Sequence, residues 1–333
     1  AYRSDPAFLA ARGMTNLPNE YYQVTNTHFV TNELAAFGEL TYRFNDNLWV
    51  TGGLRYGRLD VQGFTEDSGY TSNYLVNALY GINGPLTIGQ NTPLTGDKGV
   101  EEGPSYKFSV SYSPVDNMTM YATYSTGFRT PAVNARGGAP STVDPTDIII
   151  PDGASSDELE NIEIGLKGRW FNNRLHANIA AYTIDWSNIQ VQANRVSDQV
   201  QFATNIGGAT SRGVELEINA FPTEGLLIGM NASWNDSEVD DLSATEAAIS
   251  GAVRGAPLSF PEFQGAIYLN YTRQLTANIE GFAAVNARHV DGFVNQFPNV
   301  PGRPGVQSPT YAPTEDYQSV NASVGAYIGD NVT

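Results

Sequence analysis

The stretch YKFSVSYSP, from Tyr106 to Pro114, decides the fold class because it alternates apolar and polar residues with a period of two. One side of an extended chain carries Phe108, Val110 and Tyr112, and the other carries Lys107, Ser109, Ser111 and Ser113. This alternation predicts a β-strand whose two faces meet different surroundings. The apolar face would meet a core in a soluble sandwich and lipid in a membrane barrel, so the rest of the chain has to decide between them.

Composition narrows the function classes. The 333 residues include 35 acidic and 18 basic ones, a formal net charge of −17. This balance disfavours nucleic acid as a partner and is compatible with a cationic or metal-bearing ligand. The absence of cysteine excludes disulfides, thiolate metal sites and thiol nucleophiles. The 33 glycines and 18 tyrosines, with only 16% charged residues, favour strands and turns over helices.

Membrane and targeting segments are not indicated by hydrophobicity. No run of about 18 apolar residues occurs, so no membrane-spanning helix is expected. The N-terminal AYRSDPAFLAARG lacks a basic region followed by an apolar segment, so no signal peptide is expected. The protein is therefore expected to be cytosolic, or its sequence to begin after the signal.

Period-two alternation continues along most of the chain and predicts about eleven strands. Ten of them pair as five hairpins, and the eleventh, Val320 to Ile328, ends in a turn sequence with no partner strand after it. The five hairpins close at short turns near Asn45–Asn47, Pro114–Asn117, Asn172–Asn173, Pro222–Gly225 and Arg273–Thr276.

Long polar loops alternate with these short turns. The loops are expected near residues 62–103, 130–159, 193–208, 240–261 and 290–315. Structureless loops of this length are uncommon inside compact soluble domains, yet here they recur on one rim of the predicted sheet. Short turns on one rim and long loops on the other are typical of an outer-membrane barrel.

The polar face supports the same fold, because it carries charges that need water or each other. Those charges are Glu39, Arg43, Lys107, Glu163, Lys167, Glu215, Glu217, Glu280 and Arg288. A wide lumen would supply that water. Aromatic residues where strands meet turns, such as Trp49, Tyr112 and Trp170, predict an interfacial girdle. We therefore predict an all-β, transmembrane, antiparallel up-and-down β-barrel spanning residues 1–333, with Phe108 facing lipid and Lys107 facing the lumen.

Four strings in this chain resemble the TonB-dependent receptors of Gram-negative outer membranes. They are ELAAFGELTYRFNDNLWVTGGLRY (Glu33–Tyr56), YATYSTGFRTPAVN (Tyr121–Asn134), ELENIEIGLKGRWFNNRLHANIAAYTIDWSNIQV (Glu158–Val191) and NIGGATSRGVELEINAFP (Asn205–Pro222). The resemblance covers roughly residues 33–328. It implies a barrel of about 22 strands that is filled by an N-terminal plug and binds ligand through its long loops.

The resemblance also implies what the protein does and what it contacts. A receptor of this kind imports a scarce nutrient, such as siderophore-bound iron or another large ligand, with proton-motive energy from the inner-membrane TonB/ExbB/ExbD complex. Its other partners would be outer-membrane lipids, lipopolysaccharide, the extracellular ligand and, in some receptors, a surface lipoprotein. Neither a cofactor nor an enzymatic activity is implied.

Parts of the family pattern have no counterpart in this sequence. These are the plug, the energy-coupling box, the signal peptide and the final strands. We therefore expect the chain to be an internal portion of a longer polypeptide, with its first strand near about the ninth of 22.

Candidate ligand contacts lie where strands run into long loops. The six candidates are Arg129, Asn134, Arg136, Gln190, Gln192 and Arg195. Arginine can form bidentate pairs with the anionic groups of a ligand, and glutamine can hydrogen-bond a polar one. The alternative for Arg129 is that it pairs with a lumenal acid or the plug and orders the loop.

Metal sites and catalytic sites have little support in the sequence. The acidic string Asp236–Asp241 lacks the glycine and terminal glutamate of an EF-hand and is interpreted as a solvated loop. His28, His176 and His289 lie far apart and show no metal-type spacing, so they are expected in the lumen or in loops. No GxSxG, Walker or GxGxxG motif stands in a strand-to-helix context.

Two other functions are compatible with a barrel. A passive porin would have about 16 to 18 strands and an open lumen. A lipase or protease barrel would need a Ser/His or Asp/His set at one rim, and no such set is evident in the sequence.

Overall fold

A computed structural model describes residues 2–3, 21–69, 89–93, 98–134, 137–141 and 143–329, with side chains described from residue 28 to 63 and from 99 onward. In this part of the chain nearly all regular structure is β. Eleven long strands are present: β2 (Tyr21–Arg43), β3 (Leu48–Gly69), β5 (Lys98–Val115), β6 (Met118–Phe128), β9 (Glu158–Trp170), β10 (Leu175–Asn194), β11 (Gln201–Ala220), β12 (Leu226–Asp241), β13 (Phe263–Thr276), β14 (Ile279–Val290) and β15 (Tyr317–Ile328). Within these residues no helix is long and apolar enough to cross a membrane.

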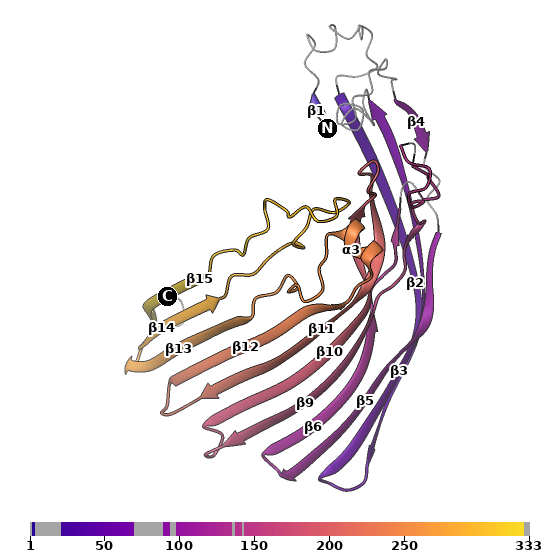
Figure 1. Cartoon of the computed structure of the whole chain (residues 1–333). Coiled ribbons are helices and arrows are strands. Elements are labelled where there is room, and N and C mark those ends of the chain that lie inside the picture. The colour runs from indigo at the N-terminus through magenta and orange to yellow at the C-terminus, as the bar shows by residue number, and fades with distance from the viewer. Residues whose placement is uncertain are drawn as a thin grey trace.

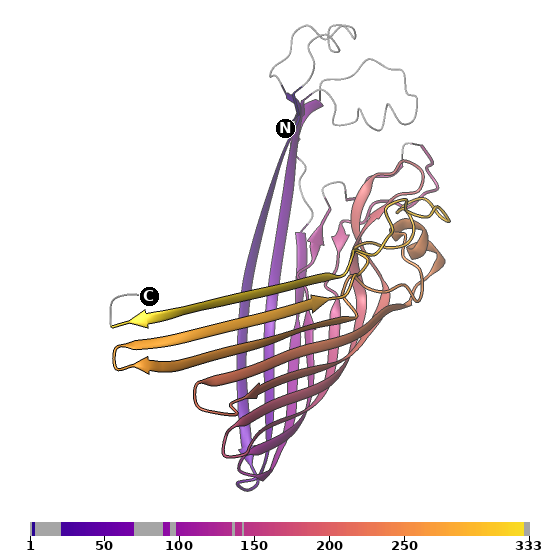
Figure 2. The same ribbon diagram turned by 90° about the vertical axis from the view of Figure 1, so that its left-hand side faces the viewer.

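Each long strand pairs antiparallel with its neighbour in the sequence, so the sheet is a simple meander from β2 to β15. The short strands β1 (Tyr2–Arg3) and β4 (Gly89–Pro93) add to β2 and β3. The sheet curves into an open arc, with β2 at one edge and β15 at the other (Figures 1 and 2). This meander confirms the predicted up-and-down topology.

The short turns lie together at one end of the arc, and the long connections lie at the other (Figure 1). Turn chemistry explains the short end. In the β2–β3 turn the Asn45 side-chain Oδ1 accepts hydrogen bonds from the backbone N–H of Asn47 and Leu48, both at 2.8 Å. In the β9–β10 turn Phe171, Asn172 and Asn173 all have positive φ, and asparagine tolerates that conformation better than most residues. The five predicted hairpins are thus confirmed.

Two of the predicted loops are shorter in the structure than the sequence suggests. The loop expected at 193–208 shrinks to residues 195–200, because Asn194 pairs with Gln201 and the ladder continues along β10 and β11. The loop expected at 62–103 loses both ends to β3 and β5, and Gln62 pairs with Lys98. Backbone pairing does not depend on apolar side chains, so polar and glycine-rich ends of strands resemble loops in the sequence.

The other long connections contain structure of their own. Short strands β7 (Ala132–Val133) and β8 (Gly153–Ala154) pair within the β6–β9 connection. Helix α3 (Ala244–Ser250) lies between β12 and β13, with a capping box formed by Ser243 and Glu246. Glu246 also accepts a hydrogen bond from the backbone N–H of Gly207 at 3.1 Å. The helix is therefore fastened to β11.

The two faces of the sheet differ as the alternation predicts. One face carries apolar side chains that remain exposed, including Leu40, Ile164 and Val324, the last at 84%. A contiguous apolar surface of this extent marks contact with lipid or protein, and on a membrane strand it is the lipid face. The opposite face carries the charged residues and lines the hollow of the arc.

In the described part of the chain the packed core lies where the ends of strands β10–β12 meet the β6–β9 and β12–β13 connections. One cluster joins Ile189, Ile206 and Val239 to Leu258, and the partly buried Trp186 packs on it. A second cluster contains Ile150, Ala193, Phe202 and Ile249. Each fully buried aliphatic side chain contributes about 1.5–3 kcal/mol, so these connections pack as an ordered layer on the ends of strands β10–β12.

Candidate functional site

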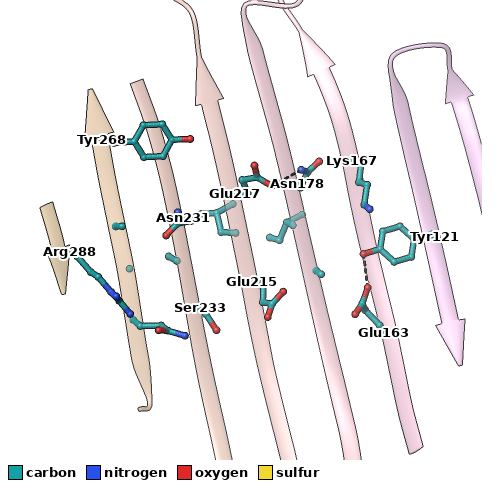
Figure 3. Close-up of a pocket in the computed structure, with 17 residues that line it drawn as sticks. Tyr121, Glu163, Lys167, Asn178, Glu215, Glu217, Asn231, Ser233, Tyr268 and Arg288 are labelled. Atoms are coloured by element: carbon teal, nitrogen blue, oxygen red, sulfur yellow. Dashed lines mark hydrogen bonds between the residues drawn. The ribbon is translucent and has the colours of Figure 1, made fainter. Parts of the chain in front are cut away.

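The polar face of the arc forms a wide hollow over strands β6 and β9 to β14. Its volume is about 770 Å³. Glu163, Glu215 and Glu217 line it together with Lys167 and Arg288 (Figure 3). These residues belong to the lumenal set that the alternation predicts. The wall thus presents charges of both signs to the space inside the arc.

Hydrogen bonds between neighbouring strands hold part of this wall in place. Tyr121 donates from its hydroxyl to Glu163 Oε1 at 2.7 Å, and Asn178 Nδ2 donates to Glu217 Oε2 at 3.0 Å (Figure 3). The Lys167 ammonium lies 5.3 Å from the centre of the Tyr121 ring. The wall is therefore partly neutralised from within, and this limits the cost of crowding several carboxylates.

Two tyrosine rings on this face fill the space beside a glycine in the neighbouring strand. Tyr121 pairs with Gly165, and Tyr268 pairs with Gly229. A Cβ at Gly165 would lie 2.4 Å from Tyr121 Cζ, and one at Gly229 would lie 2.0 Å from Tyr268 Cζ. These positions accept only glycine while the rings remain where they are, and the rings cover the backbone that glycine leaves open.

The long-loop end of the sheet is organised around an ion pair with a buried carboxylate. Arg129 follows β6, and its Nε donates to both carboxylate oxygens of Asp157 at 3.0 and 2.7 Å. Its guanidinium also lies 4.7 Å from the centre of the Trp186 ring. Trp186 Nε1 donates to Asp157 Oδ2 at 2.8 Å. Three segments far apart in the sequence are thereby joined at one carboxylate.

The buried carboxylate of Asp157 has an altered acidity. Its side chain is 0% exposed. Burial opposes its ionisation, but the hydrogen bonds from Arg129 and Trp186 outweigh burial and hold its pKa below the ordinary value. Asp157 therefore remains ionised at neutral pH.

Gln190 and Asn134 are both engaged with backbone groups. Gln190 Nε2 donates to the carbonyl oxygens of Thr130 and Ser155, at 2.9 and 3.0 Å. Asn134 is buried, and its Nδ2 donates to Ala203 O at 2.7 Å while its Oδ1 accepts from Ala203 N at 2.7 Å. These contacts tie the β6–β9 connection to β10 and β11.

Arg195 is buried as well, at 3% exposure, in the short β10–β11 connection. It forms a two-point pair with Asp198, at 2.9 and 2.6 Å, and its Nη1 donates to Ala139 O at 2.8 Å. Burial opposes ionisation of Asp198, but hydrogen bonds from Arg195 and from the Val200 backbone hold its pKa below the ordinary value. The pair with Asp198 lies within the β10–β11 connection, and the bond to Ala139 joins this connection to the β6–β9 connection.

Gln192 differs from the other candidates, because its side chain is exposed and makes no hydrogen bond within the described part of the chain. It borders a cavity of about 330 Å³ at the long-loop end. The β14–β15 connection also lines this cavity, through residues that include Asn295, Gln296 and Asn299. The Gln296 amide is bound by Ser308 and Thr310, whereas the free amide of Gln192 is suited to a polar ligand. Arg136, the sixth candidate, lies outside the described residues.

Sequence reasoning missed the two acids that hold the arginines. Asp198 lies three residues after Arg195, so a local ion pair was available as a signal. Asp157 lies far from Arg129 in the sequence, and no short spacing connects the two. Only the antiparallel pairing of β6 with β9, which sets Phe128 opposite Glu158, brings them together.

Comparison with known proteins agrees with this architecture. The family described as "TonB dependent receptor-like, beta-barrel" matches residues 1–333. An uncharacterized TonB-dependent receptor of Haemophilus influenzae is 24% identical over 251 residues, which cover 74% of this chain and 60% of that protein. A probable TonB-dependent siderophore receptor of Acinetobacter baumannii, PiuA, is 26% identical over 136 residues, 40% of this chain and 17% of that protein.

A solved structure shows the same fold. The ferric yersiniabactin uptake receptor FyuA of Yersinia pestis superimposes with a TM-score of 0.62 at 16% identity. The match covers 93% of this chain but 40% of FyuA. The chain thus spans less than two thirds of the length of these relatives.

The matching family consists of transporters, not enzymes, and its barrels lie in the outer membrane of Gram-negative bacteria. The open arc is accordingly a part of such a barrel. This chain belongs to the TonB-dependent receptor-like β-barrel family.

Proposed function

We propose that the chain forms part of the barrel wall of an importer that carries a siderophore-bound metal, or a ligand of similar size and polarity, across the outer membrane. The observation that carries the proposal is the polar wall of the arc. Its charged side chains, which include Glu163 and Arg288, line a hollow in the arc. The eleven strands form an open sheet and do not close around this hollow. A lumen wide enough to need more strands than these, and polar on its inner wall, suits a large hydrophilic ligand.

The siderophore class is supported by the relatives. The printed names of PiuA and FyuA refer to siderophore or ferric yersiniabactin uptake. Family membership implies an interaction with TonB. ExbB and ExbD would act with TonB to supply the energy for import. The apolar outer face would meet membrane lipids and lipopolysaccharide, while the N-terminal plug and a surface lipoprotein remain predictions from the family resemblance.

Ligand contact is proposed for the exposed amide of Gln192 at the long-loop end. Gln192 is the first candidate, because its amide is free and borders a cavity. The hydrogen bonds of Arg129, Asn134, Gln190 and Arg195 support the alternative role, in which these side chains order the loops. Arg136 remains a proposed contact on the sequence argument alone.

The proposal is tested by measuring uptake of a radiolabelled ferric siderophore in cells that contain the protein, lack it, or contain it in a strain without TonB. Uptake that is lost in both deficient strains supports an energy-coupled importer. Uptake of small solutes that persists without TonB would instead favour the passive porin.

A further inference from the structure

A histidine and two aspartates meet where β14 and β15 leave the sheet. His289 is near the end of β14, Asp291 follows that strand, and Asp316 directly precedes β15. His289 Nε2 lies 2.7 Å from Asp291 Oδ1. One potential ligand atom from each residue can be chosen so that all three lie within 4.8 Å of one another. The sequence gives no indication of this group, because Asp316 arrives from the far end of a long connection.

The backbone brings the two arms of that connection together. Val290 pairs with Tyr317, so the residues just outside this pair are adjacent. The backbone N–H of Gly292 donates to Asp316 Oδ1 at 2.9 Å. A Cβ at Gly292 would lie 2.0 Å from the carbonyl oxygen of Thr314, so only glycine permits this approach. The position of Asp316 relative to Asp291 is thus set by main-chain contacts.

Neighbouring groups also restrain the first arm. The backbone N–H of Asp291 donates to Phe263 O at 2.9 Å. The Phe263 ring lies beside the His289 imidazole, with centroids 6.0 Å apart and planes inclined by 34°. The Gly292 contact uses only one oxygen of Asp316, which leaves its second carboxylate oxygen for a further bond. The three side chains are therefore partly oriented before any ligand arrives.

The donor set favours a borderline divalent cation. Imidazole nitrogen suits zinc, copper, iron and nickel, whereas magnesium and calcium prefer oxygen ligands throughout. Two carboxylates neutralise the charge of such an ion. Zinc binds tetrahedrally at about 2.0–2.2 Å from nitrogen and oxygen ligands. The three groups need only small adjustments to share one ion, and His289 Nε2 and Asp291 Oδ1, which are 2.7 Å apart, would open slightly. A fourth position would remain open to water.

We propose that His289, Asp291 and Asp316 bind one Zn²⁺ or a similar divalent transition-metal ion at the base of the β14–β15 connection. The ion joins the two arms of residues 291–316, because His289 and Asp291 lie on one arm and Asp316 on the other. Binding therefore stabilises the closed base of this connection. The site is independent of the ligand that the barrel imports.

The test uses untagged protein isolated from outer membranes in detergent and treated with a chelator. Zn²⁺ binding is measured by calorimetry, and Co²⁺ is used as an optical probe of the same site. His289→Ala and Asp316→Asn are compared with Glu315→Gln, which removes an exposed carboxylate next to Asp316 that is outside the group. We expect one ion per protein, an affinity at least tenfold lower in the first two variants, and no change in Glu315→Gln.

A second measurement follows the joined arms. Chymotrypsin cleavage after Tyr311 should slow on addition of Zn²⁺ in the unaltered protein and in Glu315→Gln, and should not respond in His289→Ala. Heat-modifiable migration on gels shows whether each variant is folded. If His289→Ala does not fold, Asp316→Asn decides the matter, because its amide oxygen can still accept the Gly292 N–H. Absence of Zn²⁺ binding, or binding equal in Asp316→Asn and Glu315→Gln, would overturn the proposal.

Discussion

Arg129 and Asp157 form an ion pair in which the carboxylate is fully buried and the guanidinium is about half exposed. The pair joins the end of β6 to the residue before β9, and Trp186 of β10 completes it. Its two partners are unequal. Removing the arginine leaves a buried charge without its main partner, whereas removing the acid leaves an arginine that water can reach.

This asymmetry predicts that Arg129→Ala opens the β6–β9 connection more than Asp157→Asn does. Loss of a cation beside a buried carboxylate costs up to about 3–5 kcal/mol in fully buried pairs, and the half-exposed arginine places this case below that range. Hydrogen exchange of the backbone N–H of Gln190 reports local opening of the β6–β9 connection. Faster exchange in Asp157→Asn than in Arg129→Ala would contradict the assignment of the buried partner.

The same pair variants separate loop ordering from ligand contact. If Arg129 acts by ordering the loop, Arg129→Ala and Asp157→Asn should both weaken ligand binding, in proportion to how far each opens the connection. If Arg129 contacts the ligand, Arg129→Ala should weaken ligand binding while the backbone N–H of Gln190 in that variant remains protected from hydrogen exchange. Titration of labelled ligand on cells with equal surface expression measures the difference.

The lowered pKa of Asp157 predicts that the stability of the β6–β9 connection depends on pH. Because the folded-state pKa is lowered, its contribution to stability is complete above the unfolded value of about 3.9 and is lost as the pH falls through the lower folded value. Protection of the β6–β9 connection should thus hold at pH 5 and decline below about pH 4. The Asp157→Asn variant should lack this component of the decline. An identical pH profile in the variant and the unaltered protein would contradict the role of the Asp157 carboxylate.

The Tyr268 ring packs directly against Gly229, so a side chain added at Gly229 should disturb the packing of the inner wall. Gly229→Ala should displace the Tyr268 ring and break its 2.6 Å hydrogen bond to Asn219, with an overpacking cost of about 1–3 kcal/mol. Gly103→Ala in β5 is the matched control, because a Cβ there meets nothing within 4 Å.

The temperature at which the folded gel band disappears measures the effect of Gly229→Ala. Adding Tyr268→Ala to Gly229→Ala should recover part of the loss, since the clash is then gone. A Gly229→Ala protein as stable as Gly103→Ala would show that the ring moves without cost.

Substitution of Gln192, whose side-chain amide is free, should have a different effect from substitution of Gln190, whose side-chain amide is hydrogen-bonded. Gln192→Ala should lower ligand affinity by about two- to tenfold, the value of one neutral hydrogen bond, without loosening the loops. Gln190→Ala should instead raise exchange in the β6–β9 connection, because Gln190 holds Thr130 and Ser155. Unchanged affinity in Gln192→Ala, at equal surface expression, would remove Gln192 from the ligand site.

The sequence predicts the membrane-spanning part of the fold far better than the loop end. Strict alternation, as in Phe108, Val110 and Tyr112, determines strand, face and register together, because a shift of one residue would turn every apolar side chain into the lumen. The short turns follow from asparagine and glycine chemistry. Both kinds of information are local.

The loop end depends on contacts that are not local. The strand from Gln201 to Gly208 is polar and glycine-rich, and only its pairing with β10 shows that it is a strand. Asn134 meets Ala203, and Asp316 meets Asp291, across long stretches of chain. Five of the six candidate residues lie at the long-loop end of the sheet, and Arg136 lies outside the described residues. The bonding partners of Arg129, Asn134, Gln190 and Arg195 required the three-dimensional register.

The measurement that tests the central claim most directly is a density map of the protein in native outer membrane, with the strands counted around its lumen. We predict that the arc continues into a closed barrel of about 22 strands with a folded domain inside. An empty lumen enclosed by about 16 to 18 strands would identify a passive porin and contradict the energy-coupled importer.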